Sequence, residues 1–389
     1  MHSAIMTGWA HSRFGKSDAP DVESLIAEVG TAALEHSGIT AAEVEFVALG
    51  VSNNGFSKQG FEAGLVGLAI PGLEETPAVH VENACATGSA ALHAALDFVE
   101  SGRGHVALAI GAEKMTGVDT SKVGDILLAG SYRPEEGDIE GGFAGVFGRI
   151  AGSYFQANGD RSRELAMIAA KNHENGVHNP YGHMRKDLGV DLCNTISEKN
   201  PRVAGPLRRT DCSLVSDGAA AIVVMSEEMA RGAPRGIQFL ARSHSNDIFP
   251  LSRRDPTAFE GPRRAWAQAF ERSGLSLQDL DLVETHDCFT VAEMIEYEAM
   301  GLTKRGEGWK AAAEGWTRKD GKLPVNPSGG LKSRGHPIGA TGISQHVMAA
   351  MQLMEEAGDM QIPRAATAGV FNMGGAAVTS YVSLMRRTS

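Results

Sequence analysis

One cysteine stands where its position in the chain favours nucleophilic chemistry. Cys85 follows a short apolar run, Ala78-Val-His-Val81, and directly precedes Ala86-Thr-Gly, which begins an amphipathic helical pattern. The unpaired N–H groups and partial positive charge at a helix N-terminus stabilise a thiolate, and so they lower the thiol pKa from about 8.5. We therefore expect Cys85 to be a nucleophile. The alternative is a small buried side chain at a strand–helix turn.

A histidine occupies the corresponding position before a second helix. His336 is held between Gly335 and Pro337, ahead of Ala340-Thr-Gly342, so the tripeptide Ala-Thr-Gly begins a long helix twice. A Gly-Pro turn leaves the imidazole little rotational freedom. This suits a base that takes the cysteine proton or a donor to a carbonyl oxygen. A histidine that only caps the helix is the alternative.

Two further segments carry polar groups that could reach a ligand. His286-Asp-Cys-Phe289 follows the predicted strand at Leu282-Val283, and open α/β sheets place ligands at such strand ends. A metal site is disfavoured because adjacent residues of an extended chain point to opposite faces and no further ligands are evident. We expect Cys288 to carry a proton and His286 to donate a hydrogen bond. Asn372-Met-Gly-Gly375 is predicted to be a tight turn that aims backbone N–H groups at an oxygen.

These residues lie in alternating apolar runs and helical patterns, which indicate a mixed or parallel sheet covered by helices. In the first half, a helix with Leu92, Leu96 and Val99 on one face leads to Val106–Ile110, which is apolar enough to be a buried central strand.

The last third repeats this plan. Its helix carries Ile343, Val347 and Met351 on one face, and each half is predicted to end in a Gly-Ala-Ala strand, at Gly218–Val224 and Gly375–Val378. The sequence therefore predicts a duplicated α/β fold.

A long insertion interrupts the first half only. It is glycine-rich at Gly141–Gly145 and helical from about Arg163 to Asn172, and we interpret His173, His178 and His183 as solvated loop histidines. Long segments of this kind inside a compact domain are usually functional covers. We expect the insertion to cap a ligand site.

Composition narrows the function classes. The 389 residues carry a net charge of −11, with 42% hydrophobic and 21% charged residues, which is typical of a globular protein and argues against nucleic acid as a partner. The four cysteines are widely spaced, which indicates neither a zinc site nor a disulfide framework. No run reaches the ~18 apolar residues of a membrane span. We expect a cytoplasmic protein without a membrane span.

The motifs together resemble the thiolase superfamily, and within it the sterol-carrier-protein type. The segments are Asn83-Ala-Cys85-Ala-Thr-Gly, Asn326-Pro-Ser-Gly-Gly and Gly335-His-Pro-Ile-Gly-Ala-Thr-Gly342. Ordinary thiolases have Asn-Glu-Ala-Phe in place of His286-Asp-Cys-Phe289 and Cys-x-Gly in place of Asn372-Met-Gly374. The resemblance implies a duplicated, five-layered α-β-α-β-α architecture. Its parts would be an N-terminal half at 1–118 completed by 208–232, an inserted cap at 119–207, and a C-terminal half at 233–389.

The resemblance also implies a mechanism. Cys85 would accept an acyl group, and His336 would activate it and help bind the thioester oxygen. Cys288 would act as acid and base, and His286 would hold a water that completes an oxyanion hole with His336. The backbone N–H groups of Cys85 and Gly374 would form a second hole. The reaction would make or cleave the carbon–carbon bond of 3-ketoacyl-CoA, with coenzyme A as a substrate and no metal or tightly bound cofactor.

Three related functions are alternatives. One is a thiolase-fold retro-aldolase acting on 3-hydroxyacyl-CoA, another a condensing enzyme acting on acyl-carrier protein, and a third a non-catalytic acyl-CoA-binding scaffold subunit. Retention of Cys85, Cys288 and His336 favours the acyltransferase. The family implies a homodimer or tetramer. Some relatives dock a small protein with an oligonucleotide-binding fold and a zinc ribbon, which is a further candidate partner. Ser216 and Asn326 are candidate neighbours of the ligand.

Overall fold

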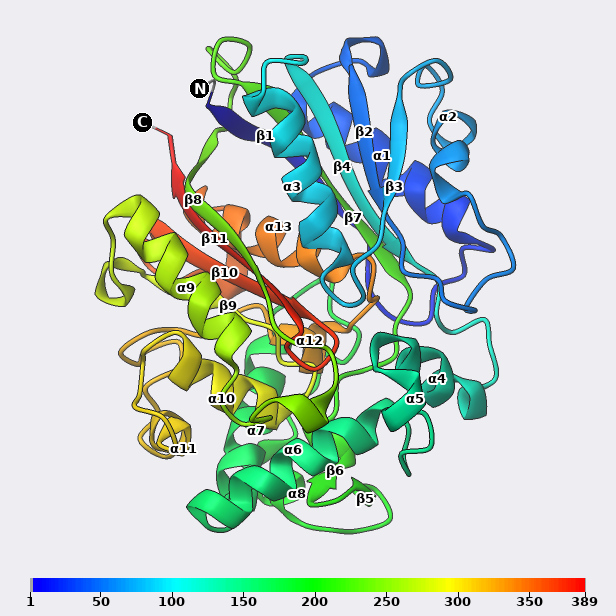
Figure 1. Cartoon of the computed structure of the whole chain (residues 1–389). Helices are drawn as coiled ribbons and strands as arrows, with labels where there is room; N and C mark the ends of the chain where they lie inside the picture. Colours follow the sequence, from blue (N-terminus) through cyan, green and yellow to red (C-terminus); the bar gives the residue numbers. More distant parts are fainter. Residues whose placement is uncertain (1–2, 389) are drawn as a thin grey trace.

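Strands from both halves of the chain join in one mixed sheet. The computed structural model describes residues 3–388, so the outermost ends of the predicted domain boundaries lie outside it. The sheet has nine strands (Figure 1). In sheet order they are β3 (Ala78–Val81), β2 (Phe46–Gly50), β4 (Val106–Glu113), β7 (Gly218–Ser226), β1 (Ala4–His11), β8 (Ile237–Asn246), β11 (Thr379–Arg387), β10 (Thr367–Gly374) and β9 (Leu282–Glu284). A separate hairpin contains β5 (Arg202–Ala204) and β6 (Leu207–Arg208).

Helices cover both halves of this sheet and build the insertion. They are α1 (Val22–Ser37), α2 (Val66–Ala69), α3 (Thr87–Glu100), α4 (Thr120–Leu127), α5 (Arg133–Glu136), α6 (Phe143–Asn158), α7 (Ser162–Gly176), α8 (Gly189–Asn194), α9 (Glu260–Ser273), α10 (Thr290–Ala299), α11 (Gly308–Ala313), α12 (Gly330–Arg334) and α13 (Thr341–Leu353). Among the described residues, no helix combines the length and apolar character needed to cross a bilayer.

The two halves are structural repeats. β1 and β8 pair through only two residue pairs, Ile5 with Gln238 and Met6 with Ile237. On either side of this junction the strand orders β1-β7-β4-β2 and β8-β11-β10-β9 correspond. Helices α3 and α13 pack against each other between the half-sheets, α1 covers the outside of the first and α9 the outside of the second (Figure 1). This confirms the predicted five-layered α-β-α-β-α architecture.

The predicted strand–helix–strand unit around Cys85 is present. β3 leads through a short turn to α3, whose residues Leu92, Leu96 and Val99 are buried, and β4 is buried along its whole length. In the second half the position of β3 is taken by a single parallel bridge between Val325 and Val283 of β9, and the chain then continues to α13 and β10. Because α3 and α13 lie side by side, the turns that precede them face one another. This packing brings Cys85 and His336 together.

The predicted strand at Gly375–Val378 is wrong. These four residues form the turn between β10 and β11, whose last pair is Gly374 with Thr379. Gly375 and Ala377 both have positive φ angles, 62° and 61°, which a strand does not allow. Asn372 and Met373, which were expected in the turn, belong to β10. Their neighbours Phe371 and Gly374 are buried with them. β10 therefore extends through the polar Asn372 to Gly374.

The insertion joins β4 to β7 and lies at one end of the sheet, in the lower part of Figure 1. Its predicted helix is present as α7 and is longer than expected. The glycine-rich stretch is not a loop throughout, because α6 begins at Phe143. Gly148 lies inside α6, where an added Cβ would come within 3.0 Å of the Ala204 backbone. Glycine therefore allows close packing of α6 against β5 here.

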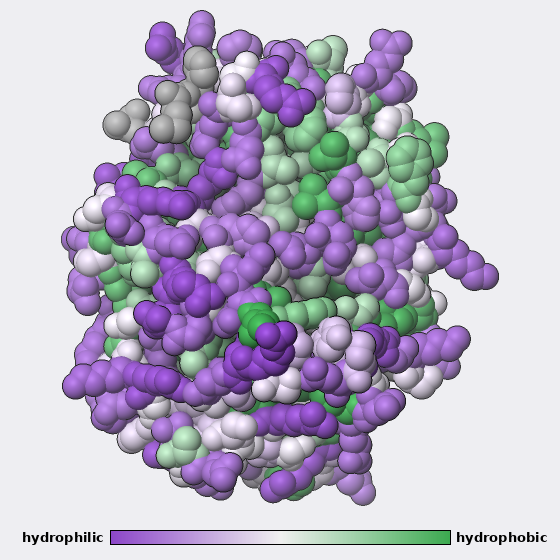
Figure 2. Space-filling model, viewed as in Figure 1, coloured by the Kyte–Doolittle hydropathy of each residue, from purple (hydrophilic) through white to green (hydrophobic). Residues whose placement is uncertain are grey.

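The face of the molecule seen in Figure 2 is mainly hydrophilic, with hydrophobic groups between the hydrophilic side chains. Among the exposed large apolar residues are Phe61 and Leu68, which precede β3 in the chain, and Val79 within it. β3 pairs only with β2, so its other edge is free within the described chain.

Candidate active site

Cys85 lies in the turn between β3 and α3 and is 7% exposed. The preceding Ala84 has a φ of 49°, a left-handed conformation that an alanine adopts only when its surroundings enforce it. The turn is tied to α3 by the Thr87 hydroxyl, which accepts the N–H of Asn83 at 2.8 Å. The Sγ atom of Cys85 is thus placed by a fixed backbone.

His336 is anchored by a threonine of α13. Its Nδ1 lies 2.7 Å from Oγ1 of Thr341, and that hydroxyl donates its single proton to the carbonyl oxygen of Pro337 at 2.9 Å. The hydroxyl can therefore only accept from the ring, so the Nδ1 of His336 carries the proton. The buried Nε2 is left with its lone pair and has no hydrogen-bond partner among residues 3–388. His336 is consequently oriented as a proton acceptor.

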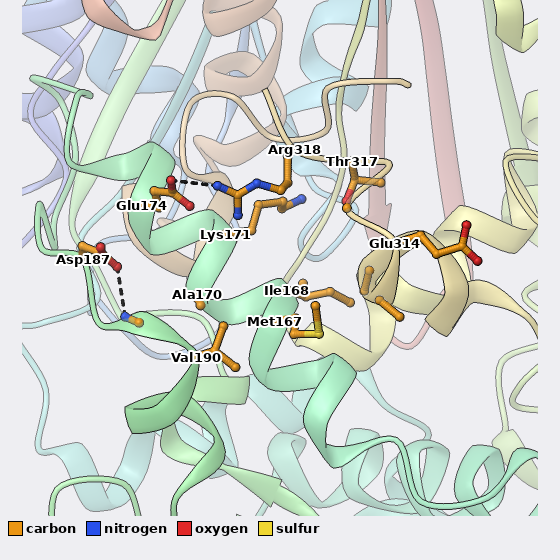
Figure 3. A pocket seen from close by; sticks show the side chains of 14 residues that line it. Met167, Ile168, Ala170, Lys171, Glu174, Asp187, Val190, Glu314, Thr317 and Arg318 are labelled. Atoms are coloured by element: carbon orange, nitrogen blue, oxygen red, sulfur yellow. Dashed lines mark hydrogen bonds and ion pairs between the residues drawn. The ribbon is translucent and has the colours of Figure 1, made fainter. Parts of the chain in front are cut away.

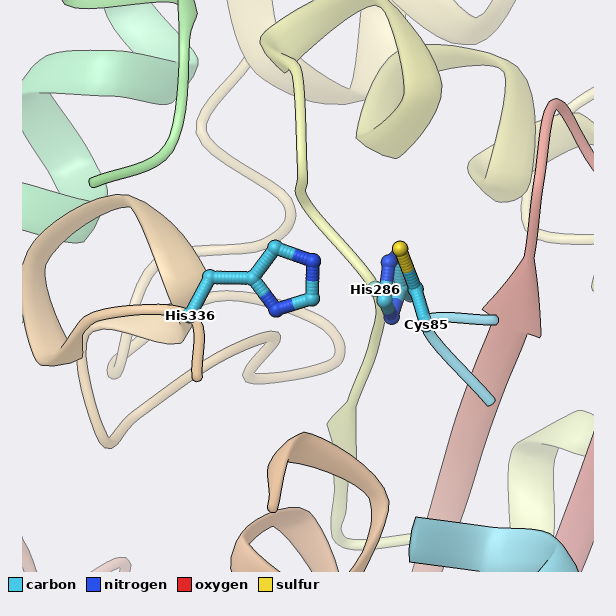
Figure 4. A group of neighbouring side chains, drawn as sticks. All are labelled: Cys85, His286 and His336. Carbon is cyan, nitrogen blue, oxygen red and sulfur yellow. The ribbon is translucent and has the colours of Figure 1, made fainter. Parts of the chain in front are cut away.

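His286 follows β9 and is fully buried. Its Nδ1 lies 2.8 Å from the side-chain nitrogen of Asn372, and its Nε2 has no partner. One nitrogen of each histidine and Sγ of Cys85 all lie within 4.8 Å of one another. Figure 4 shows the three side chains as neighbours. The two rings are nearly perpendicular, with centroids 5.1 Å apart. The structure thus brings together three of the four side chains that the sequence predicted.

Cys288 is the fourth. It is buried, and its carbonyl oxygen accepts the N–H of Ser213 at 2.9 Å. Together with Cys85, Cys212 and His336 it lines a cavity of about 230 Å³. The rest of the wall is mostly apolar and comes from both halves and the insertion: Met115, Leu127, Phe143, Val215, Phe289 and Ile338. A mostly apolar cavity lined by three thiols and an imidazole suits an acyl chain attached to a reactive carbonyl group.

Burial controls the charge state of these groups. It raises the pKa of Cys85 to about 12, and the carboxylates of Glu82 and Glu113 raise it further, while the backbone N–H groups of Gly375 and of Cys85 itself act in the opposite direction. The pKa lowering that we expected at the start of α3 is therefore outweighed. Burial and then Cys85 also hold the pKa of Cys288 well above its usual value. Both thiols are neutral at rest.

Both histidines are neutral as well. Burial, followed by the charge of Arg334, lowers the pKa of His336 to about 3. Burial, followed by His336 and Arg334, holds the pKa of His286 well below its usual range. A neutral imidazole with a free lone pair can accept a proton, which a protonated ring cannot.

A backbone donor that was not predicted from the sequence lies beside Cys85. The N–H that faces Sγ of Cys85 is that of Gly375, one residue beyond the predicted Gly374. Gly374 instead lies in β10 against the turn of Cys85, where a side chain would come within 2.4 Å of the Asn83 carbonyl oxygen.

Several supporting residues were not identified from the sequence. Asp287 accepts the N–H groups of Leu331 and Lys332, at 2.6 and 3.1 Å, and so fixes α12 just ahead of His336. Glu113 accepts the N–H of Gly339 at 3.0 Å and those of Ser52 and Asn53, which ties the loop of His336 to the first half. These acceptors and their donors are far apart in the sequence and meet only in the folded chain. The spacing of residues in the sequence therefore did not indicate these hydrogen bonds.

Other sequence interpretations need revision. His173 is fully buried in α7 rather than solvated, and burial lowers its pKa to about 3. His183 is partly buried and lies 2.9 Å from Ser216, while His178 is exposed as expected. Neither Ser216 nor Asn326 lines the cavity. Ser216 accepts the backbone N–H of His336 at 3.3 Å and therefore supports the site.

A larger cavity, of about 460 Å³, lies between α7, α8 and α11 (Figure 3). Glu174 and Arg318 form an ion pair across it at 2.9 Å, and Lys171 reaches inward to Glu293. None of the residues that line it is a cysteine or a histidine. We assign the chemistry to the smaller cavity because it alone contains the thiols and His336.

The chain belongs to the thiolase family. Residues 3–188 match the thiolase N-terminal domain, and residues 243–387 match the thiolase C-terminal domain-like family. Among its relatives, an acetyl-CoA acetyltransferase of Methanothermobacter thermautotrophicus is 34% identical, with full coverage of both chains. Human sterol carrier protein 2 is 32% identical over 92% of this chain and 67% of its own length.

A third relative is the benzoylsuccinyl-CoA thiolase subunit BbsB of Thauera aromatica, which is 32% identical over 77% of both chains. Solved structures share the fold at lower identity. An Ltp2-ChsH2(DUF35) aldolase has a TM-score of 0.83 at 19% identity, with 99% of this chain and 97% of that chain covered. Human mitochondrial 3-ketoacyl-CoA thiolase in complex with CoA has a TM-score of 0.77 at 18% identity, with 100% and 98% covered.

Proposed function

We propose that this protein is an acyltransferase that makes or cleaves the carbon–carbon bond of 3-ketoacyl-CoA through an acyl group on Cys85. The observation that carries the proposal is a 230 Å³ cavity that Cys85, Cys288 and the neutral His336 all line, with one nitrogen of His336 within 4.8 Å of Sγ of Cys85. Its membership of the thiolase family and the acetyl-CoA acetyltransferase among its relatives support the same reaction class.

In the cleavage direction, Nε2 of His336 takes the proton of Cys85 as Sγ attacks the 3-keto carbon. The bond between C2 and C3 breaks, which leaves an acyl group on Cys85 and the enolate of acetyl-CoA. Cys288 protonates the enolate carbon. The thiolate of Cys288 then takes the proton of an incoming CoA thiol, whose sulfur attacks the acyl group and releases Cys85 as a thiolate. That thiolate recovers its proton from Nε2 of His336, so atoms and charges balance and the site returns to its resting state. Two proton carriers are needed because one group cannot serve both sulfur and carbon at once.

Donors fixed in the folded chain would stabilise the negative oxygens. The enolate oxygen would meet His286 and the newly protonated His336, directly or through a water. For the acyl oxygen on Cys85 we propose the N–H groups of Cys85 and Gly375, because these two face the sulfur. Removal of one such donor typically costs about 10²–10³ in kcat.

The test is turnover of acetoacetyl-CoA and CoA by the purified protein, alongside longer and branched 3-ketoacyl-CoAs. The Cys288→Ala variant separates the steps. It should still accept an acyl group on Cys85 but should cleave no carbon–carbon bond. Normal turnover by this variant would show that the proton carrier lies elsewhere. Cleavage of a 3-hydroxyacyl-CoA that persists in Cys85→Ala would favour a retro-aldolase instead.

We also propose that the protein is a homodimer paired through β3, since that edge of the sheet is free and Val79 is 41% exposed there. One fold relative is titled as a complex with a DUF35 protein, and BbsB is a thiolase subunit. A small partner with an oligonucleotide-binding fold and a zinc ribbon therefore remains part of the proposal. Full turnover by the isolated chain would show that such a partner is not required.

A further inference from the structure

Asn372 contacts both sides of the candidate site from β10. Its side-chain nitrogen lies 3.1 Å from the carbonyl oxygen of Cys85 and 2.8 Å from Nδ1 of His286. A carbonyl oxygen can only accept a hydrogen bond, so the amide nitrogen, and not Oδ1, must face Cys85. The amide nitrogen has two protons, one for each of these acceptors. Asn372 is therefore oriented by the backbone of the nucleophile itself.

This orientation decides which nitrogen of His286 carries a proton. Because Asn372 donates to Nδ1, that nitrogen must offer its lone pair, and the proton of the neutral ring lies on Nε2. The Nε2 atom is buried and has no partner in the described chain. His286 therefore presents an N–H to the site. His336 has the opposite tautomer, because Thr341 holds its Nδ1 proton. The two imidazoles offer one donor and one acceptor beside Cys85.

We propose that Asn372 is a positioning residue that locks His286 as an Nε2–H donor for the substrate oxygen, and that the same lock keeps Cys85, His286 and His336 from binding a thiophilic divalent cation such as Zn²⁺. The catalytic half of this inference rests on the proposed function. The metal half does not, because it depends only on the tautomer.

The three side chains would otherwise form a competent metal site. A cysteine and two histidines with ligand atoms within 4.8 Å of one another are a common zinc ligand set that needs only a small contraction. A metal takes the lone pair of an imidazole nitrogen and not its N–H. To bind a metal through Nε2 while Asn372 is in place, His286 would have to move its proton to Nδ1. That proton would then point at the amide protons of Asn372. Rotation of the amide is disfavoured because it would turn Oδ1 of Asn372 toward the carbonyl oxygen of Cys85, which has no proton to donate.

The variant Asn372→Asp reverses the lock at almost constant size. A carboxylate can only accept, so Nδ1 of His286 would carry the proton and Nε2 would present its lone pair to the site. Orienting partners of this kind change metal affinity by about 10–100-fold. We expect the variant to bind Co²⁺, used as a spectroscopic probe for Zn²⁺, about 10–100-fold more tightly than the parent, with thiolate-to-cobalt absorption that disappears in the double variant with Cys85→Ser. Its kcat should fall by about 10²–10³, with a smaller change in KM.

The matched control is Gln345→Glu. Gln345 is a buried amide that donates to the carbonyl oxygen of Phe371, next to Asn372, and among the described residues it forms no hydrogen bond with His286 or His336. This control introduces a buried carboxylate into the same region, so it should lower thermal stability without raising Co²⁺ affinity. Equal Co²⁺ affinity in Asn372→Asp and the parent would overturn the lock. If the parent protein has no thiolase activity, the proposed function is refuted. The Co²⁺ affinities would still test which tautomer His286 adopts.

A measurement on the unmodified protein avoids any dependence on the folding of Asn372→Asp. The ¹⁵N chemical shifts of its histidines distinguish protonated from unprotonated ring nitrogens, and comparison with His286→Gln assigns the signals of His286. We expect an unprotonated Nδ1 and a protonated Nε2. The opposite assignment would overturn the proposal.

Discussion

The reactivity of Cys85 should depend steeply on pH. Only the thiolate reacts with iodoacetamide, and burial raises the pKa of Cys85 to about 12, so roughly 10⁻⁵ of the thiol is ionised at pH 7. A cysteine with an ordinary pKa of about 8.5 would be ionised to roughly 3% at that pH. Because the pKa lies above the whole range tested, the alkylation rate of Cys85 should rise about tenfold per pH unit from pH 7 to pH 9.

The assay is alkylation under excess iodoacetamide, with peptide mass analysis to follow Cys85 separately from the other three cysteines. His336→Gln should leave the slope unchanged, because the neutral His336 forms no ion pair with a neutral thiol at rest. A rate that levels off below pH 8 would refute this reasoning. It would show that the N-terminus of α3 outweighs burial and that Cys85 is already a thiolate.

Burial raises the pKa of Glu113 from its usual 4.5 to about 7. Between these two pH values the folded protein still holds a proton that the unfolded chain has lost. The free energy of unfolding should therefore fall by about 3 kcal/mol as the pH rises through this range. Urea denaturation should therefore show that Glu113→Gln gains about 3 kcal/mol relative to the parent between pH 5 and pH 8; a constant difference would contradict the shift. Thr341→Val removes the acceptor of the Nδ1 proton of His336 and should lower kcat about tenfold or more while leaving Cys85 alkylation at pH 9 unchanged. Unchanged kcat would show that Thr341 does not orient the ring. Val79→Lys places a charge at the free edge of β3 and should convert a dimer into monomers of 41.0 kDa in size-exclusion chromatography; an unchanged elution volume would place the interface elsewhere.

Local sequence signals predicted the parts of the fold that rest on local physics. The apolar runs at Ala78–Val81 and Val106–Ile110, and the repeated Ala-Thr-Gly before α3 and α13, identified strands and helices correctly because burial and helix periodicity are visible in one segment. The turn at Gly375–Val378 was missed because its composition is also that of a buried strand.

What the sequence could not predict depends on segments that meet only in the fold. The glycines at 141–145 were noted in the sequence, but α6, in which Gly148 allows close approach of β5, was not predicted from it. The sequence predicted that Asn372 belongs to a turn. In the structure its amide contacts His286, which lies 86 positions earlier in the chain. The pKa of Cys85 was expected to fall because the helix start is visible in the sequence, whereas the burial that raises it is not.

The central claim is that Cys85 accepts the acyl group of a CoA thioester. The most direct measurement is peptide mass analysis of Cys288→Ala after incubation with acetyl-CoA, since this variant should load the acyl group and then stall. We predict one acetyl group on the peptide that contains Cys85, and none after Cys85→Ser is added. An acetyl group on another residue, or none on a folded protein that binds CoA, would contradict the account.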